Sequence, residues 1–201
     1  MIFYIPKKNV RIGYNNIGDD GMRYISSSLK VNKSVKVLHL WGNQLENLGA
    51  KFLADCLREN EHLLELRICS NKIRDEGAKI LFQSLKCNKS LTLFDMSYNN
   101  DVGDESAQHL LEALRVNKSI TVLDFCGNRV KKSLLEELKV QVEENRRCVI
   151  INRQIKKAML VLRSRPECVV SKVPRRVLMY LLSFLDTPKF EEDDKKRKRN
   201  L

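Results

Sequence analysis

The sequence is poor in glycine and proline, the residues that interrupt regular structure. Its 201 residues include only eight glycines and four prolines, which excludes a collagen-like or a linker protein. No apolar run approaches the roughly 20 residues of a membrane-spanning helix. The N-terminal segment MIFYIPKKNV has neither a basic start nor a long apolar stretch, so we expect no secretory signal.

The six cysteines are scattered singly along the chain, at positions 56, 69, 87, 126, 148 and 168. No two of them form a C-x-x-C pair, so the sequence predicts no metal site of that type and no cofactor. Isolated thiols are typical of a reducing compartment. We therefore expect a cytoplasmic protein.

Residues for catalysis are equally scarce. The three histidines, His39, His62 and His109, fall in segments that are not expected to converge. The sequence contains neither a phosphate-binding glycine loop nor a nucleophile elbow. We therefore expect that the protein is not an enzyme and takes no small-molecule substrate.

The net charge of +12 is unevenly distributed. Residues 153–201 carry 14 basic and six acidic side chains and so hold most of the excess. The basic character belongs to the last quarter of the chain, and we do not expect the main domain to bind nucleic acid.

The strongest pattern is an internal repeat of the form apolar-x-apolar-x-x-Asn. It occurs five times, at intervals of 28, 28, 28 and 29 residues, with its asparagines at Asn15, Asn43, Asn71, Asn99 and Asn128. A period of this length predicts a solenoid in which each unit buries its apolar face against its neighbours. The asparagine amide is suited to satisfying backbone groups of adjacent turns.

The second half of each unit predicts a helix. Four units place a residue suited to an N-cap after the repeat asparagine: Asp19, Asn47, Asp75 and Asp104. Apolar residues follow at helical spacing, and each helix is expected to end near a further asparagine: Asn32, Asn60, Asn88, Asn117 and Asn145. The predicted fold is an α/β solenoid, a curved horseshoe with parallel strands on the concave side and helices on the convex side.

These residues resemble the leucine-rich repeat family, and the period resembles its ribonuclease-inhibitor-like subclass. The resemblance covers roughly residues 8–152 and implies a scaffold for protein partners, since repeats of this type serve many functions. The subclass includes the Ran GTPase-activating protein, so regulation of a small GTPase is an alternative that rests on fold analogy alone.

Alternate strand positions should point to the concave face and form the candidate partner site. This site comprises Arg11, His39, Trp41, Arg67, Asp95, Ser97, Tyr98 and Asp124. Exposed Trp, Tyr and Arg are enriched in binding hot spots. Two structural alternatives stay open: the charges pair between neighbouring strands, or Trp41 packs over them. We expect a monomer that binds a protein partner on this face.

The repeat stops after Asn152. Residues 134–145 predict the last outer helix, 148–152 one further strand, and 153–165 a capping helix. We divide the chain into a repeat domain at 1–152, a helical C-terminal element at 153–188 and a charged, disordered tail at 189–201.

The C-terminal element contains the stretch SKVPRRVLMYLLSFLDTP, whose pattern predicts an amphipathic helix. It resembles the opening helix of an F-box, which implies docking to a Skp-type adaptor of cullin ubiquitin ligases. The candidate docking residues are Pro174, Val177, Leu178, Leu181, Leu182 and Leu185. The alternative is a second capping helix on the solenoid end. A docking helix would make the chain a substrate receptor of a ubiquitin ligase, whereas a capping helix would leave it a simple interaction module.

The tail ends in a basic cluster that matches a nuclear import signal: Lys195, Lys196, Arg197, Lys198 and Arg199. Nuclear import is therefore an alternative to a purely cytoplasmic location.

Overall fold

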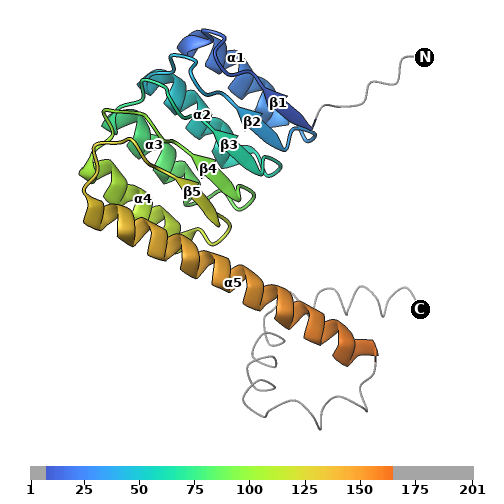
Figure 1. Cartoon of the computed structure of the whole chain (residues 1–201). Helices are drawn as coiled ribbons and strands as arrows, with labels where there is room; N and C mark the ends of the chain where they lie inside the picture. Colours follow the sequence, from blue (N-terminus) through green and yellow to red (C-terminus); the bar gives the residue numbers. More distant parts are fainter. Residues whose placement is uncertain (1–7, 165–201) are drawn as a thin grey trace, which may run out of the picture. The chain divides into compact units, whose positions relative to one another are not determined.

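A computed structural model describes residues 8–164, in which five short strands alternate with five helices (Figure 1). The strands are β1 (Asn9–Arg11), β2 (Val37–His39), β3 (Glu65–Arg67), β4 (Leu93–Asp95) and β5 (Val122–Asp124). The helices are α1 (Gly18–Val31), α2 (Asn47–Glu59), α3 (Asp75–Leu85), α4 (Asp104–Val116) and α5 (Lys132–Ser164). None of these helices combines the length and apolar character needed to cross a membrane.

The strands form one parallel sheet in the order β1-β2-β3-β4-β5. The register follows the repeat, so Leu38 lies opposite Leu66, and Leu66 opposite Phe94. Each strand is therefore hydrogen-bonded to the equivalent strand of the next unit, as the 28-residue spacing predicts. The leucine-rich repeat fold predicted from the sequence is confirmed.

The core lies between the sheet and the helices. The middle residue of each central strand is buried, as are the helix residues expected at the apolar positions, including Ala50, Leu53 and Leu57. Phe82 of α3 packs edge-on against Phe94 and Phe125, with ring centroids 6.4 and 5.9 Å away. One continuous apolar cluster joins the units, because no single unit could bury its own face.

The repeat asparagines form what we call the inner ladder: Asn15, Asn43, Asn71, Asn99 and Asn128. The Asn71 side-chain oxygen accepts the amide N–H groups of Asn43 and Leu45, both at 3.0 Å. Its side-chain nitrogen donates to the carbonyls of Leu40 and Ile68. Each central asparagine thus satisfies backbone groups of its own unit and of the preceding one, which short strands would leave unpaired.

The predicted helix N-caps act differently from the expectation. The N-cap positions are Ile17, Glu46, Arg74 and Gly103, and none has a side-chain capping bond. The residues predicted as caps bind the start of the following helix instead: Asp19 accepts the Glu46 N–H, Asn47 the Arg74 N–H, Asp75 the Gly103 N–H, and Asp104 the Lys131 N–H. We call these four side chains the helix-start ladder.

Glycine makes room for the helix-start ladder. A Cβ atom on Gly77 would lie 2.7 Å from the side-chain oxygen of Asn47 and 2.8 Å from its Cα atom. A Cβ on Gly49 would meet the Asp19 carboxylate in the same way. Glycine inside these helices therefore allows close contact between successive units.

The asparagines at the helix ends form an outer ladder: Asn32, Asn60, Asn88, Asn117 and Asn145. The Asn60 side-chain oxygen accepts the N–H groups of His62 and Leu63, and its nitrogen donates to the carbonyls of Leu29 and Asn32. The first pair of bonds turns the chain out of the helix. The second pair links the turn to the preceding unit.

The predicted strand at 148–152 is wrong, because residues 132–164 form one helix. Asn145 keeps the inter-unit bonds to Leu114 and Asn117. Its oxygen, however, accepts from Gln141 at 3.4 Å rather than from the two following backbone N–H groups. Without that turn the helix continues, so residues 153–164 of the separate helix expected at 153–165 are part of α5. The chain divides into two compact units, 1–149 and 150–201.

We predict that Asn99→Ala lowers the free energy of unfolding by about 3 kcal/mol, because it leaves several buried backbone groups unpaired. Asn99 is fully buried and donates to the carbonyls of Ile68, Met96 and Ser97. The exposed neighbour provides the control, Asn100→Ala, in urea denaturation. Equal stability of the two variants would contradict a structural role for the inner ladder.

We also predict that Gly77→Ala destabilises the protein by about 2 kcal/mol through overpacking. Helix propensity alone predicts the opposite sign, a gain of about 1 kcal/mol. Thermal or urea unfolding of this variant decides between the two. A stabilised variant would show that the helices move apart at no cost.

Candidate functional site

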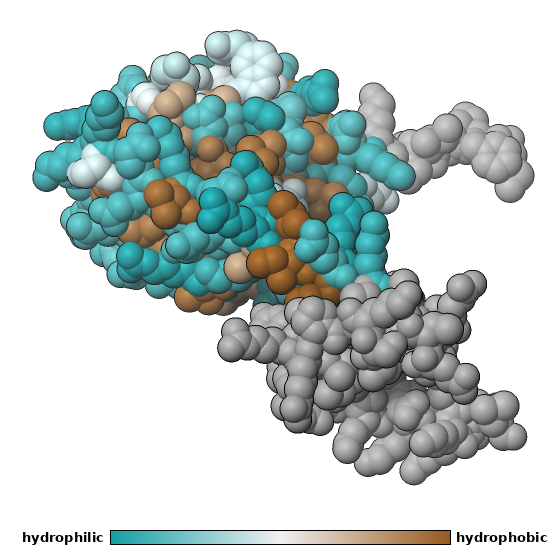
Figure 2. All heavy atoms as spheres, turned by 60° about the horizontal axis from the view of Figure 1, so that its bottom comes forward, coloured by the Kyte–Doolittle hydropathy of each residue, from teal (hydrophilic) through white to brown (hydrophobic). Residues whose placement is uncertain are grey.

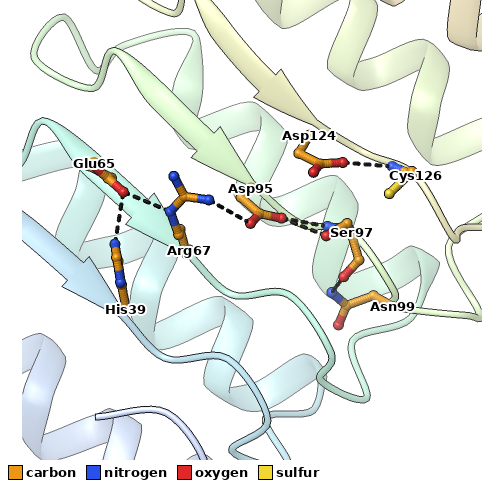
Figure 3. A network of polar contacts seen from close by, with 8 residues as sticks. All are labelled: His39, Glu65, Arg67, Asp95, Ser97, Asn99, Asp124 and Cys126. Carbon is orange, nitrogen blue, oxygen red and sulfur yellow. Dashed lines mark hydrogen bonds and ion pairs between the residues drawn. The ribbon is translucent and has the colours of Figure 1, made fainter. Parts of the chain in front are cut away.

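The outward side of the sheet, called the strand face below, is the predicted concave face. A polar network runs across three of its strands (Figure 3). His39 Nε2 lies 2.8 Å from Glu65 Oε1, which also accepts a bond from Arg67 Nε at 2.7 Å. The Arg67 guanidinium then reaches Asp95 Oδ2 at 3.4 Å. These charges therefore pair between neighbouring strands, which is one of the two alternatives expected from the sequence.

Asp95 and Ser97 connect this network to the inner ladder. Asp95 is only 5% exposed and accepts both the backbone N–H and the hydroxyl of Ser97, at 3.1 and 2.7 Å. The Ser97 carbonyl in turn accepts a bond from Asn99 (Figure 3). The charged side chains are therefore held in place by the interactions that join the units.

The network shifts the proton affinities of its members. The bond from Arg67 is the main cause that lowers the pKa of Glu65, and His39 adds to it. The same bond raises the pKa of the Arg67 guanidinium. Glu65 and Arg67 therefore remain a charged pair over a wide pH range.

The thiols of the strand face are held in the protonated form. Burial, followed by the Asp95 charge, raises the pKa of Cys69 to about 11. A hydrogen bond with Asp124 is the main cause that raises the pKa of Cys126. Because the thiolate is the reactive species, neither cysteine is suited to act as a nucleophile.

Aromatic side chains border the strand face where the chain leaves the strands. Trp41 is half-buried, and its ring lies where a Cβ atom on Gly13 would be, 2.4 Å from the nearest ring atom. Tyr14 packs edge-on against Trp41, with ring centroids 4.5 Å apart. Trp41 therefore packs against the turn that follows β1, and part of its ring stays exposed.

Tyr14 and Tyr98 occupy equivalent turn positions and share an unusual backbone. Both have positive φ angles, 54° and 55°, a conformation that favours glycine. Their rings lie over Gly42 and Gly127 of the following units, in space that any side chain there would fill. Both rings are nevertheless exposed, by 71% and 57%. We call Tyr14, Trp41 and Tyr98 the aromatic rim.

The remaining predicted residues of the partner site have simple positions. Arg11 and Asp124 are exposed at the ends of β1 and β5, and Asp124 accepts the Cys126 N–H at 3.2 Å.

The sequence interpretation missed Glu65 and Tyr14. Glu65 stands two residues before Arg67 and so shares its side of the strand. Tyr14 stands at the repeat position of Tyr98, a signal available from the aligned units.

Two other predicted sites lie outside the described residues. These are the adaptor-docking residues Pro174, Val177, Leu178, Leu181, Leu182 and Leu185, and the import cluster Lys195, Lys196, Arg197, Lys198 and Arg199. Both stay predictions.

Comparison with known proteins agrees with the repeat geometry. A family model described as Leucine Rich repeat matches residues 9–26, 31–54, 59–81 and 87–111. The chain is a leucine-rich repeat protein. The 28-residue register of its strands and the full helix in each unit correspond to the ribonuclease-inhibitor-like type. A search of curated proteins finds no significant match to this leucine-rich repeat protein.

Solved structures with the same fold include two domains of low sequence identity. The tropomodulin C-terminal domain of Caenorhabditis elegans aligns with a TM-score of 0.65 at 17% identity, covering 73% of this chain and 89% of that domain. A structure titled Leiomodin-1 Actin-Binding Site 2 aligns with a TM-score of 0.59 at 16% identity, covering 75% and 88%. At this identity the likeness shows the fold alone.

We predict that Glu65→Gln lowers the free energy of unfolding at pH 6 by about 1–2 kcal/mol, because the charge-assisted bonds to His39 and Arg67 weaken. The pKa of Glu65 is lowered by folding, so its contribution is present above the unfolded value of about 4.3 and is lost as pH falls through the folded value. Urea denaturation at pH 6 and pH 3 should show the difference between wild type and variant shrinking. A difference that persists at pH 3 would contradict this assignment.

Proposed function

We propose that this leucine-rich repeat protein is a non-catalytic interaction module that binds a protein partner on its strand face. The observation that carries the proposal is the aromatic rim. Tyr14 and Tyr98 keep large apolar surfaces exposed while packing fixes their positions. A rigid, exposed ring loses little conformational entropy when a partner covers it.

The backbone conformation of the two tyrosines also supports a functional role for them. A non-glycine residue at positive φ costs on the order of 1–2 kcal/mol. Of the three other equivalent turns, two have glycine, Gly42 and Gly127, and the third has the small residue Ser70, also at positive φ. Tyrosine at positions 14 and 98 is therefore not the choice that stability alone favours. Strain of this kind is typical of functional positions.

The charged network supplies the second part of the surface. His39, Glu65, Arg67 and Asp95 bind one another within the sheet, so few of their hydrogen-bonding groups remain for a partner. They form a fixed polar floor beside the aromatic rim, whose residues follow the ends of the strands. In this arrangement the rim supplies most of the binding energy and the floor supplies specificity.

The test uses the full chain with the double substitution Tyr14→Gly and Tyr98→Gly. Glycine adopts the same backbone without strain, so we expect a free energy of unfolding within about 1 kcal/mol of wild type. Partner binding should weaken at least tenfold, since exposed aromatic residues are the usual hot spots. The control is Tyr24→Ala on α1, which removes a ring of similar exposure, 66%, away from the sheet.

The measurement compares the proteins recovered from cell extract by wild type, variant and control, followed by the affinity of each purified partner. Actin is the first defined probe, because the leiomodin-1 structure is titled an actin-binding site. Partners lost by the glycine variant and kept by the Tyr24 variant support the proposal. Partners kept by both, or a glycine variant that is strongly destabilised, would assign the rim a structural role instead.

A further inference from the structure

The turns that lead from each helix to the next strand lie side by side along one edge of the sheet (Figure 1). The outer ladder fixes their stacking. The side-chain nitrogen of Asn88 donates to the Asn60 carbonyl at 3.0 Å, and that of Asn117 donates to the Asn88 carbonyl at 2.7 Å. Equivalent positions of these turns therefore form rows that cross the repeats. We call the four turns, residues 30–36, 58–64, 86–92 and 115–121, the helix-end edge.

The two edges of the sheet carry opposite charge. The helix-end edge has eight basic and two acidic side chains. The turns on the opposite edge, which lead from strand to helix, have two basic and eight acidic side chains. These turns comprise residues 15–20, 43–48, 71–76 and 99–105. The repeat domain is therefore polarised from edge to edge, and a charged surface would orient it.

Helix dipoles account for only part of this pattern. Lys30 and Arg115 lie in the last turns of α1 and α4, where positive charge is favourable. Four lysines lie beyond the last helical turns: Lys33, Lys36, Lys89 and Lys118. Within residues 8–164 none of these four pairs with a carboxylate, whereas Lys30 pairs with Glu59 and Lys86 with Glu112. All but the half-buried Lys36 are exposed, so their charges are available to a partner.

Exposed aliphatic side chains lie in the same turns. Val31 is 80% exposed and Val116 is 64% exposed. Each directly precedes an asparagine of the outer ladder and stands two residues before a lysine, in the sequences KVNKS and RVNKS. The turn KCNKS repeats this order with the exposed Cys87. The turn at 58–64 departs from it, with Glu59 and Glu61 in place of the valine and the lysine.

This combination favours an anionic lipid surface over other anionic partners. Lysine is attracted to lipid headgroups as a compact point charge, and an aliphatic side chain beside it can enter the headgroup region. None of the four turns contains Phe, Trp or Tyr, so the edge lacks the stacking residues typical of single-stranded nucleic acid binding. On the face drawn in Figure 2, apolar side chains form separate groups among polar ones, so charge dominates over apolar area.

We propose that the helix-end edge binds an anionic lipid surface, with its lysines at the headgroups and Val31 and Val116 at the boundary of the acyl chains. The acidic edge then points away from the lipid, because like charges repel. The strand face is not part of this edge and stays accessible to a protein partner. This proposal does not depend on the function proposed for the strand face.

The test measures co-sedimentation of the full chain with phosphatidylcholine vesicles that contain about 30% phosphatidylserine, at about 0.1 M salt, where charges act over about 10 Å. Vesicles of phosphatidylcholine alone are the reference. We expect the triple variant Lys33→Gln/Lys89→Gln/Lys118→Gln to bind the anionic vesicles at least tenfold more weakly than wild type, since each lysine near the surface contributes about fivefold.

The matched control is Lys51→Gln/Lys72→Gln/Lys132→Gln, which removes the same charge from exposed positions outside the helix-end edge. It should weaken binding by no more than about twofold, because salt screens charges that do not contact the lipid. Equal free energies of unfolding of the three proteins show that the repeats remain folded. The basic cluster at 195–199 is the same in all of them, so it causes no difference between them.

The valines test the mode of contact. Val31→Ser/Val116→Ser leaves every charge in place, and both positions are exposed, so folding should be unaffected. We expect about a threefold or greater loss of affinity for the anionic vesicles, because apolar groups no longer leave water. An unchanged affinity would contradict the insertion of these side chains.

Three results would overturn the proposal. The first is a wild-type chain that does not prefer the anionic vesicles. The second is equal binding by the lysine variant and its control. The third is binding of duplex DNA or of poly-glutamate that depends on the edge lysines, without binding of the vesicles. That result would assign another class of anionic partner to the helix-end edge.

Discussion

Buried side-chain amides that each bind two successive units are the interaction on which the rest of this structure depends. A strand of three residues forms too few backbone hydrogen bonds to satisfy the turns at its ends. The inner ladder supplies the missing bonds after each strand, and the outer ladder supplies them after each helix. Because an amide has both donors and acceptors, one residue type serves both needs.

The helix-start ladder adds a third set of bonds between units, at the start of each helix. Its carboxylates lie near helix N-termini, where negative charge is favourable, and they bind the unit that follows. Together the three ladders fix the spacing between units more tightly than apolar packing alone, which tolerates sliding. The strand face inherits this rigidity, since Ser97 joins its charged network to Asn99. The aromatic rim is also fixed by neighbouring units, because its rings pack over their glycines.

The repeat spacing alone predicted the parallel strands, their register and most of the core, because a period shared by five asparagines admits one stacking arrangement. The sequence could not show that Asp19 binds the next unit, since the same residue is also suited to a local cap. It could not show that α5 continues past Asn145 either. That outcome depends on which N–H groups bind the side-chain oxygen of Asn145. Asn145 and Asn117 are the same residue type, so the sequence does not distinguish them.

The candidate site was predictable in position but not in chemistry. Alternation along a strand places His39, Arg67 and Asp95 on one side. Whether their charges face a partner or each other depends on Glu65, which stands where three of the other four units have an apolar residue, Val37, Leu93 and Val122. The exposed tyrosines required the turn geometry, because only a positive φ angle shows that tyrosine replaces a more favourable glycine.

Native-state hydrogen exchange of the amides bound by the inner ladder tests the central claim most directly. The Asn43 and Leu45 amides donate to Asn71, and the Ile73 amide donates to Asn99. All three lie in turns, where amides usually exchange quickly. The account predicts that they exchange as slowly as the amides of the central strands, and therefore open only with the whole repeat stack. Exchange as rapid as that of exposed turn amides such as Asn100 would show that the ladders do not hold the units together.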